Sequence, residues 1–247
     1  IHAGIYYQTG SHKSNLCLRG KHLLYEYCKK NSIRHSKIGK LFLAVSSDEI
    51  SRLEETLKQA QSNGLEDLYF LNYKEIKKIE PEIQGVAALL SPSTGTIDSY
   101  GFMQSLFSLG QNEGVLFAAK SPVTDAEPFK NGWKIHIGGS EPTSVTCKGV
   151  VNASGLYAIQ LSKLIFPQRE IPTLFPSKGS YIKYFGKSPV NHIIYPAIIP
   201  GVIEERVDAT PDLEGFLRFG PNVEETSNIE DYTLSPELVE KMLSGIK

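Results

Sequence analysis

The stretch Lys40-Leu41-Phe42-Leu43-Ala44-Val45 decides the predicted fold, because its unbroken apolar run has the length of one buried strand. Ser46 and Glu49 follow with the spacing of a capping box. Apolar residues then recur at helical spacing from Ile50 to Ala60, and Gly64 is a typical helix stop. A buried strand that leads directly into a helix is typical of α/β proteins.

The same alternation extends outward from this unit in both directions. Periodicity and punctuation predict helices over 13–30, 50–64, 73–79, 98–114 and 156–166, strands over 40–45, 68–71, 115–118 and 145–153 and within 85–97, and a hairpin over 123–137. Strand-like pieces separated by Pro and Gly dominate from residue 171 to residue 220. We therefore predict a mixed α/β fold whose domains are threaded through one another.

Composition excludes several classes of protein. The chain has 247 residues, with 26 Lys and Arg against 27 Asp and Glu, which argues against a nucleic-acid binder because such a protein needs a basic face. The longest apolar candidate, 193–203, is broken by two prolines, so no membrane span is predicted. The 3 widely spaced cysteines favour neither disulfides nor a zinc site, and no metal site is predicted.

Both ends of the chain suggest a piece of a longer protein. The sequence begins at Ile1 without an initiator Met or a readable signal peptide. Near the other end, Ser235-Pro236-Glu237 starts a helix whose apolar stripe stops soon afterwards at Lys247. We expect 235–247 to be the start of a truncated helix.

General motif searches find no familiar signature. No two glycines are separated by one residue, so the chain has neither a dinucleotide fingerprint nor a P-loop. It also lacks a G-x-S-x-G elbow, an H-E-x-x-H helix and a C-x-x-C pair. Any chemistry must therefore be sought in less regular segments.

Two segments have the small residues that let a backbone approach a ligand. His2 lies between small residues at the start of the chain and could lie over a planar ligand, although a stray surface His explains it as well. The run 150–156 passes from an apolar strand through Asn152-Ala153-Ser154-Gly155 into a helix, where backbone N–H groups can face a phosphate. An ordinary strand–helix turn is the alternative.

A third region has polar groups suited to a small oxygenated substrate. Lys178 beside a glycine is a reasonable anion contact, and His192 and Tyr195 could bind or polarise an oxygen. The alternative is a solvated Lys with a packed His and Tyr in a sheet.

Taken in order, these segments resemble the FAD-dependent oxidoreductases of the D-amino-acid oxidase superfamily, most of all its L-2-hydroxyglutarate dehydrogenase/oxidase branch. The matching runs are IHAGIYY (1–7), KSNLCLRG (13–20), GKLFLAV (39–45), EPEIQGV (80–86), SPSTGTIDS (91–99), NASGLYA (152–158), SKGSYIKY (177–184), NHIIYP (191–196) and RFGPNVE (218–224). HAGIYY and NHIIYP are specific to the branch, and together the runs span nearly the whole chain.

The resemblance implies an incomplete FAD-binding, Rossmann-like domain interleaved with a mixed-sheet substrate domain. The FAD domain would comprise 1–35 and 115–170, and the substrate domain 36–114 and 171–234. The residues that would contact FAD are Ile1, His2, Ala3, Gly4, Val123, Ala153, Ser154 and Gly155. Lys178, His192 and Tyr195 would lie on the substrate side.

The reaction implied by the resemblance is oxidation of a 2-hydroxy acid, above all L-2-hydroxyglutarate, to a 2-oxo acid. A base removes the hydroxyl proton while a hydride passes to flavin N5. His2 or His192 is the expected base, and Lys178 the expected carboxylate contact. The electron acceptor, whether quinone, flavoprotein or oxygen, stays open. Mitochondrial location is expected in a eukaryote and cytoplasmic location otherwise.

Departures from the family pattern keep two alternatives open. The glycine fingerprint for the FAD pyrophosphate and the C-terminal part of the family are not within these residues, and Asp208 stands where relatives have a His. A carboxylate there would repel an anionic substrate. The alternatives are a related amine or amino-acid oxidase and a non-catalytic truncated or degenerate paralogue.

Overall fold

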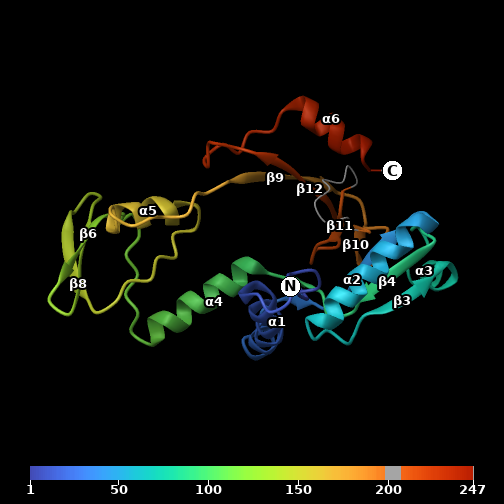
Figure 1. The fold of residues 1–247 in the computed structure, drawn as a ribbon, viewed down its shortest axis with the longest axis horizontal. Helices are drawn as coiled ribbons and strands as arrows, with labels where there is room; N and C mark the ends of the chain where they lie inside the picture. Colours follow the sequence, from blue (N-terminus) through green and yellow to red (C-terminus); the bar gives the residue numbers. More distant parts are fainter. Residues whose placement is uncertain (198–206, 247) are drawn as a thin grey trace. The chain divides into compact units, whose positions relative to one another are not determined.

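The computed structural model describes residues 1–197 and 207–246, in two compact units (Figure 1). Unit 1 comprises 1–109, 179–223 and 233–247, and unit 2 comprises 110–178 and 224–232. Residues 198–206, which precede Asp208, lie outside the described residues. Residues 1–35 and 36–109 belong to the same compact unit, whereas the sequence assigned 1–35 to the FAD domain and 36–114 to the substrate domain. A compact unit does not show which ligand each segment binds. The division into FAD and substrate domains therefore stays a prediction.

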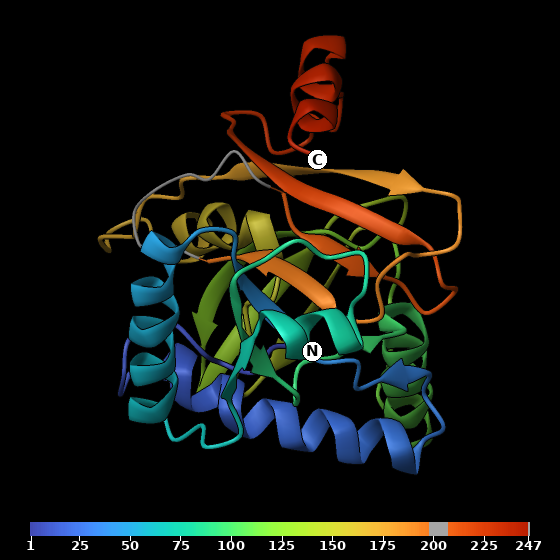
Figure 2. The same ribbon diagram turned by 90° about the vertical axis from the view of Figure 1, so that its right-hand side faces the viewer.

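Unit 1 is built around a mixed sheet with helices on both faces. Its elements are α1 (His12–Lys30), β1 (His35–Ser36), β2 (Lys40–Ala44), α2 (Ile50–Ser62), β3 (Tyr69–Asn72), α3 (Tyr73–Ile79), β4 (Ala87–Ser91), β5 (Thr96–Ile97), most of α4 (Ser99–Asn112) and β9 (Ser177–Tyr184), β10 (Ile193–Pro196), β11 (Ala209–Pro211), most of β12 (Leu217–Glu225), and α6 (Pro236–Ser244). The 7-stranded sheet has the order β3-β4-β2-β10-β11-β12-β9, and β1 pairs with β5 in a separate ribbon. In Figure 2, α1 runs horizontally below the sheet and α2 stands upright beside it.

The apolar run chosen from the sequence is a central strand of this sheet. All residues of β2 are buried, and β2 pairs antiparallel with β4 and parallel with β10. Alternate side chains of β2 point to opposite faces, so Phe42 packs with Leu53 of α2, whereas Leu41 packs with Ile76 of α3. The predicted buried strand is confirmed over 40–44, and it is buried on both faces.

The start of α2 differs in detail from the prediction. Ser46 makes no capping hydrogen bond with its side chain, and a 3₁₀ turn over Ser47–Glu49 precedes the helix. Glu49 instead accepts a hydrogen bond from the backbone N–H of Val45 through Oε2 at 2.9 Å. The end is as predicted, because Gly64 adopts the left-handed conformation with φ of 85°.

Unit 2 consists of a three-stranded sheet and one helix. The order β6-β7-β8 joins β6 (Val123–Phe129), β7 (Gly132–Ile137) and β8 (Thr143–Cys147), and a 3₁₀ turn over Gly155–Tyr157 leads into α5 (Ala158–Ile165). The predicted hairpin over 123–137 is confirmed, with its turn at Lys130 and Asn131 between β6 and β7.

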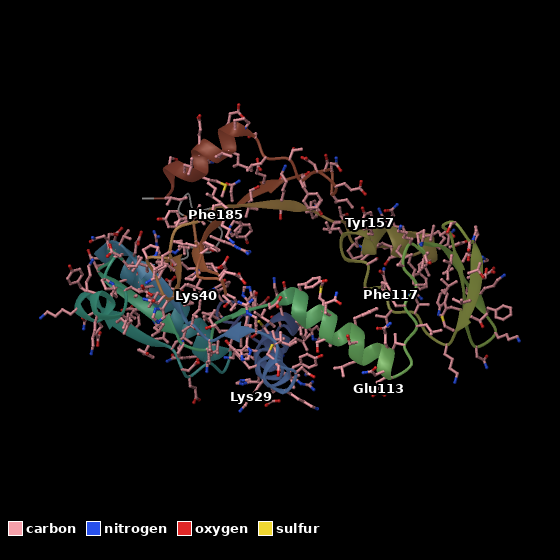
Figure 3. All side chains as sticks on the ribbon, turned by 180° about the vertical axis from the view of Figure 1, so that it is seen from behind. Lys29, Lys40, Glu113, Phe117, Tyr157 and Phe185 are labelled. Atoms are coloured by element: carbon pink, nitrogen blue, oxygen red, sulfur yellow. The ribbon has the colours of Figure 1, made fainter. Side chains whose placement is uncertain are left out.

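Of two strands predicted in unit 2, the one over 115–118 is not found, and the one over 145–153 is found only at 145–147, within β8. The run 115–118 is a loop in which Leu116 is 95% exposed, and Figure 3 shows Phe117 on this loop between α4 and β6. Strand β8 ends at Cys147, and Val151 is 89% exposed. Apolar residues supply strand propensity, but a strand also needs a hydrogen-bonding neighbour, and none of the described strands pairs with 115–118 or with 148–153.

No helix in the part of the chain that the structure describes is both long enough and apolar enough to cross a membrane.

Candidate functional site

A cleft of about 430 Å³ lies in unit 1 beside the start of β2. The N-terminal loop, the β4–α4 connection, β10 and the β11–β12 turn all contribute to it. Its lining residues are Ile1, His2, Lys40, Thr94 to Tyr100, Ile193, Tyr195, Thr210 to Glu214, and Arg218. Of the residues predicted from the sequence, the structure brings Ile1, His2 and Tyr195 together here.

Lys40 is the buried cation of this cleft. As the first residue of β2 it shares a face with Phe42, and the parallel register places Phe42 opposite Tyr195 of β10. Its ammonium nitrogen is 3.6 Å from the centroid of the Tyr195 ring and 5.3 Å from that of Phe42. The side chain is only 4% exposed, and Figure 3 marks its place within unit 1. Cation–π contact is therefore its main stabilising interaction.

Burial changes the protonation of Lys40. Desolvation lowers its pKa from 10.5 to about 8, and the negative charge of Asp208 opposes that shift. No hydrogen bond or ion pair holds this ammonium within residues 1–197 and 207–246. Lys40 thus has unused capacity to bind an anion.

Asp208 forms a hydrogen-bonded pair with Tyr195, the tyrosine whose ring contacts Lys40. The Tyr195 hydroxyl donates to the Asp208 carboxylate. Burial raises the pKa of Asp208 to about 6, although this hydrogen bond and the charge of Lys40 work in the opposite direction. Burial and the nearby carboxylate raise the pKa of Tyr195, and burial raises that of Tyr6 to about 12. Both tyrosines therefore stay protonated and act as donors at neutral pH.

His2 borders two cavities. It lines the cleft and also an apolar pocket of about 450 Å³ between α1 and α4. Partial desolvation and the positive charge of Lys40 lower the pKa of His2 below 6.5, so the imidazole is neutral at pH 7. A neutral imidazole at the border of the cleft can accept a proton.

The loop that carries His2 is held by a residue the sequence did not single out. Asn63, at the end of α2, donates through Nδ2 to the carbonyl oxygens of Gly4 at 3.2 Å, Ile5 at 3.2 Å and Tyr7 at 2.8 Å. Ala3 and Gly4 are buried, and Gly4 has φ of 86°, which only glycine adopts readily. The predicted close-approach loop is thus rigidly built.

His192 lies outside the lining of this cleft. Its Nδ1 is 2.6 Å from Oε1 of Glu80, a fully buried carboxylate after α3. The same oxygen accepts hydrogen bonds from the backbone N–H groups of His192 at 2.7 Å and Asn191 at 2.8 Å. This geometry is that of a structural anchor for the start of β10.

Lys178 lies in unit 2 and is also absent from the lining of the cleft. Its Nζ forms an ion pair with Oδ2 of Asp231 at 3.0 Å.

A pocket of about 590 Å³ in unit 2 brings together Val123 and Ser154, two of the predicted FAD contacts. Asn152 shapes the turn, since its Nδ2 donates to the Ala158 carbonyl at 2.8 Å and its Oδ1 accepts from the Ser154 hydroxyl at 2.6 Å. Gly155 has φ of 58°, and a Cβ there would meet no atom within 4 Å. The lining of this pocket is mostly apolar.

Lys40, Asn63 and Glu80 were missed because sequence signals for them are weak. A lysine at the edge of an apolar run is the one usable signal, since a charged residue rarely begins a strand buried on both faces. No group of His, Cys, Asp or Glu suited to a metal ion occurs among the residues that the structure describes.

The fold is that of FAD-binding oxidases. It is similar to L-α-glycerophosphate oxidase from Mycoplasma pneumoniae, solved with FAD bound, with a TM-score of 0.86 and 22% identity over 99% of this chain and 66% of that one. It is also similar to glycine oxidase from Geobacillus kaustophilus, with a TM-score of 0.79 and 17% identity over 98% of this chain and 64% of that one. The predicted fold class is confirmed.

The chain belongs to the family described as DAO: FAD dependent oxidoreductase, which matches residues 1–247. Its relatives include the mitochondrial L-2-hydroxyglutarate dehydrogenases of Arabidopsis thaliana, 31% identical over 100% of this chain and 59% of the relative, and of Homo sapiens, 31% identical over 90% and 50%. The L-2-hydroxyglutarate dehydrogenase of Escherichia coli is 30% identical over 90% of this chain and 52% of its own length. The chain therefore spans about half to three fifths of these relatives, and the resemblance seen in the sequence is confirmed.

Proposed function

We propose that the complete protein oxidises a 2-hydroxy acid, with L-2-hydroxyglutarate as substrate and FAD as cofactor. The relatives at 30–31% identity bear the name of this activity. The observation that carries the proposal is Lys40, a buried ammonium without an ion-pair partner among the described residues, in a cleft that also contains His2. A substrate carboxylate would supply the missing partner.

The acidic residues of the cleft do not compete for Lys40. Asp212 pairs with Lys183 at 3.1 Å, and Glu214 pairs with Arg34 at 3.2 Å. Asp98 accepts a hydrogen bond from the backbone N–H of Gly101 at 2.9 Å at the start of α4. Because these carboxylates have partners of their own, an incoming carboxylate is the natural ligand of Lys40.

His2 and Lys40 carry the proposed chemistry, and Tyr195 supports Lys40 through its ring. Neutral His2 takes the proton of the substrate hydroxyl at a ring nitrogen, and protonated Lys40 orients the carboxylate. Bound FAD would supply the two-electron oxidation, as the acceptor of the hydride that leaves the substrate α-carbon. Ala3 and Gly4 would contact the ring of FAD beside His2. Val123, Ala153, Ser154 and Gly155 are the other residues that would contact the cofactor, Val123 on its adenine side. Lys178 and His192 receive no step in this proposal.

Anaerobic addition of L-2-hydroxyglutarate to the FAD-loaded complete protein should bleach the flavin absorbance and yield one 2-oxoglutarate per flavin. D-2-hydroxyglutarate, which has the opposite configuration, is the matched control. An unchanged spectrum with confirmed FAD would refute the substrate, and reduction by glycine, sarcosine or a D-amino acid instead would support an amine or amino-acid oxidase. A purified protein that binds no FAD would favour the non-catalytic alternative.

The pH profile tests His2. Because the pKa of His2 is lowered, kcat should be constant near neutral pH and should fall only as the pH drops through a value below 6.5, where the imidazole becomes charged. His2→Asn should lower kcat about 100-fold and remove this acidic limb. His12→Asn, on the exposed start of α1, is the control. An acidic limb that persists in His2→Asn would assign the base to another residue.

The mitochondrial names of the plant and human relatives support mitochondrial location in a eukaryotic host. Cytoplasmic location in a bacterium is our proposal. In the second half-reaction the reduced flavin would pass its electrons to an acceptor, and the proposal covers a quinone, a flavoprotein or oxygen in that role.

A further inference from the structure

Asp208 is a second charge in the cluster that contains Lys40. Asp208 is the residue immediately before β11, whereas Lys40 begins β2 and Tyr195 lies in β10. Tyr195 donates its hydroxyl hydrogen bond to Asp208 while the Lys40 ammonium lies over the ring of the same tyrosine. The ammonium and the carboxylate therefore engage the same aromatic side chain, the ammonium over its ring and the carboxylate at its hydroxyl. The charge of Asp208 also raises the pKa of Tyr6.

This arrangement changes what the cleft attracts. A lone buried ammonium would favour the most highly charged anion available, because each negative charge gains Coulomb energy in a medium of low dielectric constant. The Asp208 carboxylate offsets part of that attraction for every anionic group that enters. A substrate with two carboxylates is penalised twice, and a substrate with one carboxylate only once.

We propose that Asp208 is a specificity-determining residue that weakens binding of a second carboxylate, so that the cleft accepts 2-hydroxy acids with a single carboxylate alongside dicarboxylates. This inference rests on the proposed function, in which Lys40 binds a substrate carboxylate. Asp208 does not line the cleft, so it acts through the field that it exerts on Lys40 and through its bond with Tyr195.

The test compares two substrates that differ by one charge and little else, L-2-hydroxyglutarate and its 5-amide. With the FAD-loaded complete protein, Asp208→Asn should raise the ratio of kcat/KM for the diacid to that for the amide about fivefold or more, chiefly through a lower KM for the diacid. Dissociation constants of 2-oxoglutarate and its 5-amide, measured by calorimetry, should shift in the same proportion. Asparagine keeps the size of Asp208 and an oxygen that can accept the Tyr195 hydrogen bond.

Glu54→Gln is the matched control, because it removes one carboxylate from the exposed face of α2. It should leave the ratio unchanged, which would show that net protein charge is not responsible. Should Asp208→Asn fail to fold, Asp208→Ser removes the same charge. An unchanged ratio in a folded Asp208 variant would overturn this inference alone, whereas a wild-type protein that oxidises neither substrate would overturn the proposed function.

Discussion

Lys40→Met is expected to lower kcat/KM for L-2-hydroxyglutarate about 100-fold while stabilising the fold by about 2 kcal/mol. The two effects have one cause. The buried ammonium forms no ion pair with a carboxylate among the described residues. Its desolvation therefore lowers the free energy of unfolding, and the same unpaired charge strengthens binding of the substrate carboxylate. Methionine fills nearly the same volume without a charge. Steady-state kinetics and urea unfolding of the same preparation measure both quantities.

The stability difference should depend on pH in a defined direction. The pKa of folded Lys40 is about 8, below the usual 10.5, so between these values the unfolded chain binds more protons than the folded one. The free energy of unfolding of the wild type therefore rises with pH across that window, and the penalty of Lys40 is fully present only below about pH 8. Lys40→Met lacks this rise, so its advantage should shrink from pH 8 to pH 10.5.

Lys40→Arg separates charge from geometry. Arginine keeps the positive charge but is longer and planar, so we expect only partial recovery of kcat/KM relative to methionine. A Lys40→Met protein with activity within tenfold of the wild type would show that Lys40 does not bind substrate. A Lys40→Met protein that is less stable at pH 7 would show that the aromatic contacts outweigh the desolvation cost.

Glu80→Ala should lower the free energy of unfolding by about 4 kcal/mol, the largest loss of stability we expect from a single side chain. Its fully buried carboxylate accepts hydrogen bonds from two backbone N–H groups, those of Asn191 and His192, and contacts the His192 ring. Alanine removes all of these acceptors and leaves partly buried donors without their partner. Urea denaturation monitored by circular dichroism would measure the loss.

Glu80→Gln is the informative control. It retains an acceptor oxygen for the backbone N–H groups but loses the negative charge, so about half of the destabilisation is expected. His192→Ala should cost less than Glu80→Ala, since the backbone N–H groups of residues 191 and 192 keep their acceptor. A loss below about 1 kcal/mol for Glu80→Ala would mean that water replaces the carboxylate at low cost.

The sequence predicted elements well where local pattern and tertiary environment agree. Strand β2, helix α3 and the β6–β7 hairpin have apolar periodicity, capping residues or turn residues that act over a few positions. The run 115–118 has the same apolar character as β2 but no paired neighbour among the described strands, and it is a loop. Local pattern cannot tell a strand from an exposed apolar segment, because pairing depends on residues far away in the chain.

The candidate site shows the same division. His2 and Tyr195 could be singled out from the sequence because His and Tyr in unusual runs suggest proton and oxygen chemistry. The importance of Lys40 could not be predicted, since it depends on the parallel register that brings Tyr195 beside Phe42. His192 has the same side chain as His2, yet a buried Glu80 more than a hundred positions earlier engages it.

By itself the sequence determined the class of fold, the resemblance to FAD-dependent oxidoreductases and the residues able to titrate near neutral pH, because these follow from local composition and from quoted runs of residues. Only the tertiary structure decided which of those residues share a cleft and which are engaged elsewhere. The reason is physical: burial, charge pairing and hydrogen-bond satisfaction depend on distances between segments that are remote in sequence. Lys40, Tyr195 and Asp208 come from three strands or strand ends, and their chemistry exists only where those segments meet.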